Sequence, residues 1–345
     1  MAPMLIVDAH LDLSYNALLG RDVLAPAAHQ PPDEGGIPTV GLPDLAKGGV
    51  KLICATIFCM PSLDGKPGYG SAEDAYREGV RHLDWYEEAR EAGHFSFIRT
   101  PAQLQQVVND HDHELDATQP AILLLEGADP LRDPADLPGF FDSGVRIVGL
   151  AWRETRYAGG TGTPGPLKPE AYPLIKAMDE LGMIHDASHL AEESFWQLMK
   201  ASAGPVMASH SNCRSIVPTD RQLSDDMIRA IIERGGVIGI NFFDKFLLPP
   251  ADYGHRRATL NDVVAHVRHI CDLAGDTTHV AIGTDMDGGL GRNEIPEEIA
   301  TSADLPKLAD VLAASGFAVQ DIQNIMGENW LRYFQQNLPG LDDLT

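Results

Sequence analysis

Eight short apolar runs recur along the chain, each bounded by Gly, Pro or Asp and separated from the next by a longer segment. Runs of this length that are rich in β-branched residues predict buried strands. Buried strands that alternate with helices predict a (β/α)8 TIM-type barrel of the α/β class, closed by right-handed crossovers. The predicted strands cover residues 4–12, 50–59, 120–129, 145–152, 182–189, 205–211, 236–243 and 279–288.

Helix signals occupy the segments between these runs. Several predicted helices begin at Ser or Asp and end at Gly, which are the residues preferred at the two helix termini. They cover residues 71–93, 171–182, 224–236 and 260–275. Two Pro- and Gly-rich segments, 13–45 and 157–169, are too long for plain connections and follow the first and fourth strands. In a barrel, such loops cover the active face.

Length and charge limit the organisation and the partners. A chain of 345 residues fits one barrel with insertions, and no repeat or linker divides it, so we predict a single domain over residues 1–345. The net charge of −24 would repel nucleic acid and anionic membranes. The N-terminus "MAPMLIVDAHLD" lacks the features of a leader peptide, and no apolar stretch is long enough for a membrane span. We therefore expect a soluble, cytoplasmic protein without nucleic-acid or membrane partners.

Ionisable side chains stand at the carboxyl ends of five predicted strands. Parallel strands of a barrel bring these ends to one rim, where the active sites of barrel enzymes lie. Imidazoles and carboxylates are common ligands of divalent metals, and two metals about 3.5–4 Å apart require a bridging carboxylate. Glu126 is the natural bridge. The full set is His10, Asp12, Glu126, His189, His210 and Asp285.

Each of these residues also has a purely structural explanation. Glu126 suits a helix cap or a buried ion pair, and His189 or His210 suits a hydrogen-bonded core histidine. For the set as a whole, a purely structural explanation is weaker, because buried ionisable groups that converge without a cation would repel one another or remain unpaired. Two further residues compete with members of the set. His185 shares strand parity with His189 but lies deeper, and Asp287 precedes two glycines, which is more typical of a turn than of a ligand.

The sequence resembles the membrane (renal-type) dipeptidase family, which comprises zinc peptidases of the amidohydrolase-like, metallo-dependent hydrolase barrels. The resemblance extends along nearly the whole chain and rests on motifs that recur in order. These are "DAHLD", "LLLEGADPL", "GVRIVGLAW", "DASHLAEESFW", "ASHSNCRSI", "AIGTDMDGG" and "IMGENWLRYF". The resemblance implies two zinc ions per chain, a small dipeptide as substrate and a homodimer.

The resemblance also implies a division of the ligands. His10 and Asp12 would bind one zinc ion, His189 and His210 the other, and Glu126 would bridge both.

Two further roles follow from the same resemblance. Asp285 matches the catalytic aspartate of the family, and Arg221 matches the arginine that holds the substrate's carboxylate. An arginine suits that role because it offers two parallel donors to a carboxylate.

One position departs from the family pattern. Family members carry a histidine after the fourth strand, where this chain has Trp152 in "GLAWRETRYAGG". The main hypothesis is that a hydroxide bridging two zinc ions attacks the amide of a dipeptide, with D-residues allowed at its C-terminal position, while Asp285 transfers the proton. Trp152 keeps a second hypothesis open, in which the substrate is an N-acyl amino acid, a lactone or an ester. A third is a non-catalytic barrel that binds a small ligand.

Overall fold

The computed structural model describes residues 4–63, 67–109 and 118–340. Eight parallel strands form its centre in the order β10-β11-β1-β2-β4-β5-β8-β9. A bridge between Ala208 and Ile238 joins the last of these strands to the first, so the sheet closes into the predicted barrel. The strands are β1 (Ile6–Leu11), β2 (Val50–Phe58), β4 (Gln119–Glu126), β5 (Val145–Gly149), β8 (Ile184–Asp186), β9 (Val206–Met207), β10 (Ile238–Ile240) and β11 (Val280–Ile282).

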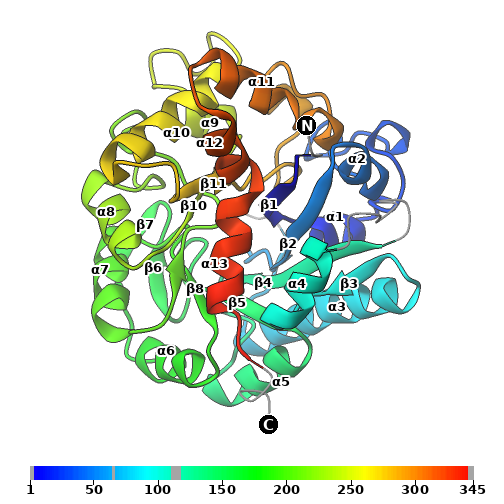
Figure 1. Ribbon diagram of the computed structural model, residues 1–345. Helices are drawn as coiled ribbons and strands as arrows, with labels where there is room; N and C mark the ends of the chain where they lie inside the picture. The colour runs from blue at the N-terminus through cyan, green and yellow to red at the C-terminus, as the bar shows by residue number, and fades with distance from the viewer. Residues whose placement is uncertain (1–3, 64–66, 110–117, 341–345) are drawn as a thin grey trace.

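Helices surround this barrel (Figure 1). They are α1 (Leu13–Leu18), α2 (Leu42–Lys47), α3 (Ala72–Glu91), α4 (Pro101–Asn109), α5 (Leu137–Asp142), α6 (Ala171–Glu180), α7 (Glu192–Ala201), α8 (Asp225–Glu233), α9 (Asp244–Leu247), α10 (Leu260–Ala274), α11 (Lys307–Ala314), α12 (Val319–Gln323) and α13 (Asn329–Asn337). All four predicted helices are present. The predicted N-cap of α8 is also present, because the Ser224 side chain accepts a hydrogen bond from the Met227 amide.

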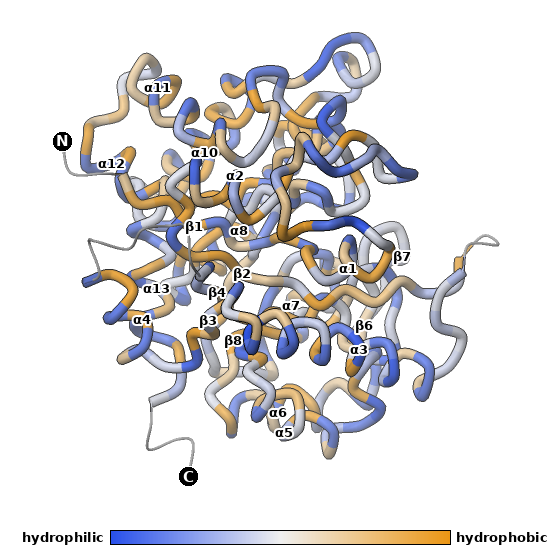
Figure 2. Tube along the Cα trace, turned by 90° about the vertical axis from the view of Figure 1, so that its right-hand side faces the viewer, coloured by the Kyte–Doolittle hydropathy of each residue, from blue (hydrophilic) through white to orange (hydrophobic). Residues whose placement is uncertain are grey.

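The buried side chains form two layers. An inner cluster fills the barrel with residues such as Leu52, Leu124 and Met207, and an outer cluster packs the other faces of the strands against the helices. Figure 2 shows hydrophobic and hydrophilic residues alternating along the surrounding helices, as this packing requires.

Helix α13 closes one end of the barrel and crosses the centre of Figure 1. Its buried residues Trp330 and Phe334 join the inner cluster, and the Trp330 indole donates a hydrogen bond to the Ile282 carbonyl at 2.8 Å. A π-helical segment, Asn324–Glu328, leads into it. Since α13 covers the end where the strands begin, chemistry is left to the opposite rim.

Several elements differ from the prediction, and the predicted loop 13–45 contains helix α1 and the start of α2. A short strand β3 (Phe95–Phe97) pairs with β4 outside the barrel order. The predicted loop at 157–169 contains an antiparallel hairpin, β6 (Ala158–Gly160) and β7 (Thr163–Leu167). The last four barrel strands are only two or three residues long.

Within the described ranges, none of the helices combines the length and the apolar character that a membrane crossing requires. The single domain and the cytoplasmic location stay predictions.

Candidate metal centre

Glu126 ends β4 and lies at the middle of the site. Its Oε2 is 3.5 Å from Nε2 of His10, and its Oε1 is 3.1 Å from Nε2 of His189 and 3.5 Å from Nε2 of His210. One carboxylate oxygen therefore faces a single ring nitrogen and the other faces two different ones, which is the arrangement of a bridging ligand. Burial raises the pKa of Glu126 to about 8.

His189 and His210 form one side of the site. Their Nε2 atoms lie 2.9 Å apart, and Thr161 Oγ1 lies 2.9 Å from Nδ1 of His189. Burial lowers the pKa of both rings well below the ordinary value, and the charges of Arg221 and His10 add to this effect. Both imidazoles are therefore neutral at physiological pH, which is the form that binds a metal.

His10 and Asp12 form the other side. The former belongs to β1 and the latter is the N-cap residue of α1, and His10 Nε2 lies 3.9 Å from Asp12 Oδ2. Within the part of the chain that the structure describes, His10 Nε2 and Asp12 Oδ1 are buried without a hydrogen-bond partner. Burial raises the pKa of Asp12, and the nearby carboxylates of Glu126 and Asp285 raise it further.

These atoms fit divalent cations. Buried polar atoms are normally hydrogen-bonded, so unpartnered acceptor atoms that converge in one place are suited to hold a cation. Two groups of three side chains are close enough to hold one ion each on the two sides of Glu126. They are Glu126, His189 and His210, and His10, Asp12 and Asp285. The structure thus brings all six sequence-predicted residues to one rim, while their roles as ligands stay predictions.

Asp285 follows β11 and faces the same rim. Asn241 donates a hydrogen bond to its Oδ2 at 2.8 Å, and burial raises its pKa to about 7. A Cβ atom at Gly288 would lie 2.0 Å from Asp285 Oδ1 and 2.9 Å from Asp12 Oδ2. Only glycine at position 288 therefore leaves room for both carboxylates.

Arg221 lies behind His210. Its Nη2 donates to the His210 carbonyl and its Nη1 to Ser211 Oγ at 3.0 Å, while its buried Nε has no partner among the described residues. The side chain is only 4% exposed and does not line the pocket described below. Arg221 thus contacts the site through the backbone of His210, but it does not face the pocket. Its contact with a substrate stays a prediction.

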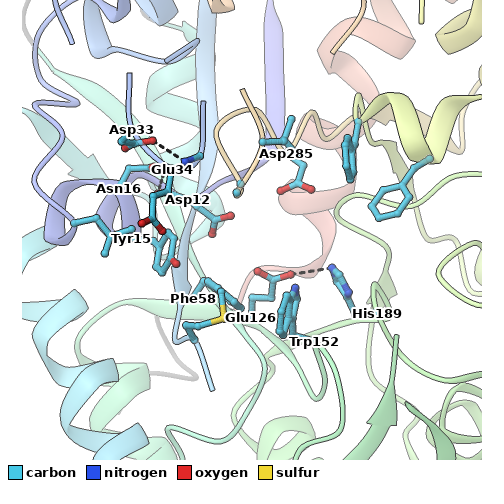
Figure 3. A pocket seen from close by; sticks show the side chains of 18 residues that line it. Asp12, Tyr15, Asn16, Asp33, Glu34, Phe58, Glu126, Trp152, His189 and Asp285 are labelled. Atoms are coloured by element: carbon cyan, nitrogen blue, oxygen red, sulfur yellow. Dashed lines mark hydrogen bonds and ion pairs between the residues drawn. The ribbon is translucent and has the colours of Figure 1, made fainter. Parts of the chain in front are cut away.

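A pocket of about 550 Å³ opens over this centre. Figure 3 shows Asp12, Glu126, His189 and Asp285 around it, with Trp152 beside Glu126. The other lining residues include Tyr15, Phe58, Phe243 and Phe246 on its apolar walls, and Asp33 and Glu34 from the 13–45 segment. The pocket is of the size that small-molecule sites have.

The two rival residues have other partners. His185 Nε2 is 2.7 Å from Asp179 Oδ1, on α6, so its side chain points away from the site. Its parity with His189 fails because β8 ends at Asp186 and His189 has a left-handed φ of 67°. Asp287 accepts hydrogen bonds from the amides of Thr39 and Val40 and so fixes the 13–45 loop. His189 and Asp285 lie at the rim instead, and their roles stay predictions.

Four supporting residues escape prediction from the sequence. Asn241 and Gly288 contact Asp285, as described above. Asp186 and Ser209 lie under the histidines, where Ser209 Oγ is 2.7 Å from Nδ1 of His210. The only available signal is position, since each of these residues ends a barrel strand or lies in the segment that follows one.

Two proteins illustrate which sequences this chain is similar to. A Klebsiella pneumoniae protein described as "Uncharacterized protein in pqqA 5'region" is 35% identical over 208 residues, which is 57% of this chain and 74% of that protein. An uncharacterised dipeptidase of Schizosaccharomyces pombe is 30% identical over 207 residues, which is 59% of this chain but only 49% of the yeast protein.

A solved structure is similar over almost the full length. It is a metallo peptidase from Rhodobacter sphaeroides liganded with a phosphinate mimic of the dipeptide L-Ala-D-Ala. It has a TM-score of 0.82 and 25% identity, and the likeness covers 97% of this chain and 99% of that one. The barrel fold predicted from the sequence is thereby confirmed, whereas the metal's identity and number and the oligomeric state stay predictions.

The family profile described as membrane dipeptidase (peptidase family M19) matches residues 1–338. This match confirms the family resemblance seen in the sequence. It also confirms the predicted enzyme class, which is that of a dipeptidase. The chain therefore belongs to the membrane dipeptidase family, peptidase family M19.

Proposed function

We propose that this protein hydrolyses the amide bond of small dipeptides with the help of two zinc ions. The observation that carries the proposal is the position of Glu126, whose Oε2 faces one ring nitrogen, of His10, and whose Oε1 faces two others, of His189 and His210, at 3.1–3.5 Å. We assign His10 and Asp12 to one zinc ion and His189 and His210 to the other. When bound, the ions would polarise the scissile carbonyl and make the attacking water acidic enough to react near neutral pH.

Asp285 is the proposed general base and acid. Because Asn241 holds Oδ2, Oδ1 is the oxygen free to take a proton from the attacking water and to deliver it to the leaving amine. The pKa of about 7, caused by burial, suits both steps, because the carboxylate gains and loses a proton near physiological pH.

The charges of the pocket favour a substrate with a free amino group. Five carboxylates line it, those of Asp12, Asp33, Glu34, Glu126 and Asp285, and no Lys or Arg side chain does so within the described residues. Asp33 is paired with Arg21, whereas Glu34 lies on the same side of the pocket as Asp12 and Tyr15 (Figure 3). The ammonium group of a dipeptide would be attracted to this side, and an N-acyl amino acid has no such group.

The Rhodobacter relative carries a mimic of L-Ala-D-Ala, so we propose dipeptides with a C-terminal D-residue as the first substrates to test. Arg221 would attract the terminal carboxylate, and direct contact would require its Nη atoms to leave Ser211 and His210.

Trp152 favours the second candidate function, an amidohydrolase of N-acyl amino acids. It stands where the family has a histidine, and its ring lies 5.1 Å from that of Phe58 and 6.4 Å from that of His189. This apolar wall would suit an acyl group.

A substrate panel with metal control tests both proposals. L,L- and L,D-dipeptides and matched N-acetyl amino acids are incubated with enzyme as purified, enzyme after chelation, and chelated enzyme with zinc restored. We expect dipeptide cleavage that chelation abolishes and zinc restores. Cleavage of only the acetylated compounds would favour the second candidate. Stoichiometric zinc without turnover of any amide would contradict both and favour a non-catalytic binding barrel.

A further inference from the structure

A single hydroxyl group lies between the two histidines that we assign to different zinc ions. Ser209 Oγ is 3.1 Å from Nδ1 of His10 and 2.7 Å from Nδ1 of His210. The residue is fully buried and follows β9. Its third close partner is Asp186, at the end of β8, whose Oδ2 accepts the hydroxyl hydrogen at 2.5 Å.

The hydrogen-bonding capacity of a hydroxyl determines how these contacts are arranged. A serine side chain has one hydrogen to donate and two lone pairs, whereas a carboxylate can only accept. The Asp186 carboxylate is already held by two backbone N–H groups on Oδ1, from Ser188 at 3.0 Å and from Ser209 at 2.9 Å. The Ser209 hydrogen therefore goes to Oδ2 of Asp186. Both lone pairs are left for the rings, so both Nδ1 atoms must be donors.

The position of the hydrogen on Nδ1 decides what Nε2, the other nitrogen of each ring, can do at the metal site. A neutral imidazole with its hydrogen on Nδ1 has a lone pair on Nε2. In both His10 and His210, Nε2 lies 3.5 Å from an oxygen of Glu126, inside the proposed metal centre. The two rings also lie against each other, with centroids 3.6 Å apart and planes inclined by 31°, so their orientations are linked.

We propose that Ser209, anchored by Asp186, is a positioning residue that sets the Nδ1–H tautomer of His10 and His210 together and so directs one lone pair at each metal position. The tautomer part of the proposal stands on the hydrogen bonds alone, and the metal part rests on the proposed function. One hydroxyl would thus prepare both halves of a two-metal site.

The same geometry excludes a third metal position below the centre. His10, Asp186 and His210 lie close enough together to hold an ion. However, Ser209 Oγ is within hydrogen-bonding distance of all three, so the hydroxyl occupies the space that an ion would need.

The first test removes the hydroxyl. In Ser209→Ala the Nδ1 atoms lose their acceptor, and we expect zinc affinity to fall roughly 10- to 100-fold at both positions, the range seen when partners of metal ligands are removed. Zinc affinity is measured by competition with a chromophoric chelator. Ser209→Thr, which keeps a hydroxyl, is expected to restore binding. Ser188→Ala is the control for the surrounding network, because its buried Oγ accepts from the His210 amide and lies 3.4 Å from Ser209 Oγ but contacts neither ring nitrogen.

The second test keeps the shape and reverses one hydrogen bond. In Asp186→Asn the amide oxygen is held at the Oδ1 position by the two backbone N–H groups, so the NH₂ group faces Ser209 Oγ. The NH₂ group takes one lone pair of the hydroxyl, and the nearest acceptors for the hydroxyl hydrogen are the two Nδ1 atoms at 2.7 and 3.1 Å, against 3.4 Å for Ser188 Oγ. One histidine therefore accepts at Nδ1, so its Nε2 becomes protonated and unable to bind zinc. We expect this nearly isosteric variant to retain its fold but to lose high affinity at one position.

Nitrogen-15 NMR of histidine-labelled, zinc-free protein reads the tautomers directly. We expect Nδ1–H signatures for His10 and His210 in the parent and in Ser188→Ala, and one Nε2–H signature in folded Asp186→Asn. Nε2–H signatures in the parent, or wild-type zinc affinity in Ser209→Ala, would overturn the proposal. If the parent bound no zinc, the proposed function would fail while the NMR result would still decide the tautomer assignment.

Discussion

At the scale of single residues, the site depends on backbone conformations that non-glycine residues rarely adopt. His189 has a φ of 67° and Asp285 a φ of 60°, and both follow barrel strands of only three residues. Left-handed conformations cost such residues of the order of 1–3 kcal/mol and occur most often at functional sites. The two turns direct a histidine and an aspartate toward the rim instead of continuing the strand.

Asp285→Asn tests the assignment of the general base. The amide keeps the size of the side chain and its contact with Asn241 but cannot exchange a proton, so we expect kcat to fall roughly 10²- to 10⁴-fold, the usual contribution of such a group. Zinc content should remain that of the parent. The measurements are steady-state kinetics on a cleaved dipeptide and elemental analysis.

The control for this variant is Asp226→Asn, on α8, where the carboxylate is 80% exposed and paired with Arg229. It should leave both kcat and zinc content unchanged. An Asp285→Asn enzyme with parental kcat would refute the role, and one that had lost zinc would instead make Asp285 a ligand.

The sequence predicts the acting residues better than those that support them. His10, Glu126 and His210 are recognisable because each ionisable side chain ends an apolar run, and burial of such groups requires a partner. Ser209 and Asp186 carry no comparable signal, since serine and aspartate are also common in turns. Their role depends on contacts between different strands, which spacing along the chain does not specify.

At the scale of elements, the eight strands and the helices between them are predictable because burial and periodicity are local signals. The lengths of the late strands are not. The run 279–288 contains the three-residue strand β11, because the chain leaves strand conformation before Asp285 to build the rim. Helix α13 covers the barrel end through Trp330 and Phe334, a packing that local periodicity does not reveal.

Helix α10 offers a test of how a buried histidine joins elements. Nδ1 of His266 accepts from the Cys213 amide at 3.1 Å, and Nε2 lies 3.2 Å from the Leu247 carbonyl on α9. Burial lowers the pKa of His266 to about 4, against an ordinary value of 6.5. Between pH 6.5 and 4, His266 binds a proton in the unfolded chain but not in the folded protein. The free energy of unfolding therefore decreases as the pH falls through this range.

We expect His266→Gln to be less stable than the parent at pH 7 because its hydrogen bonds are disturbed. That difference should shrink between pH 6.5 and 4, by at most about 1.4 kcal/mol per pH unit. Urea unfolding of chelated protein at pH 7 and pH 5 measures it. His255→Gln, at an exposed position, is the control and should show no such trend. A difference that does not change with pH would contradict the assignment.

At the scale of the whole molecule, the closed barrel concentrates negative charge at one rim. The chain carries a net charge of −24, and Asp12, Glu126 and Asp285 are buried together where the strands end. Burial of like charges without a cation is costly. This unfavourable free energy arises at the rim, whereas α13 and the apolar inner cluster fill the opposite end of the barrel. We therefore expect metal binding and global stability to be coupled.

Metal removal should lower the stability of the entire fold in a way that depends on Glu126 and on pH. A cation that binds only the folded state at 100 times its Kd stabilises it by about 2.7 kcal/mol. Since burial raises the pKa of Glu126 to about 8, zinc must displace its proton at lower pH, so the rise in Tm on adding zinc should be larger at pH 8 than at pH 6.

Glu126→Gln provides the matched comparison, because it removes the buried charge without changing the side chain's size. Zinc-free Glu126→Gln should be at least as stable as the zinc-free parent at pH 8, since position 126 no longer carries a carboxyl group that has to ionise in the barrel, yet it should gain little from zinc. Calorimetry of both proteins with and without zinc, at constant ionic strength, separates these effects. Equal gains in the two proteins would mean that the cation binds elsewhere, and the bridging role of Glu126 would have to be abandoned.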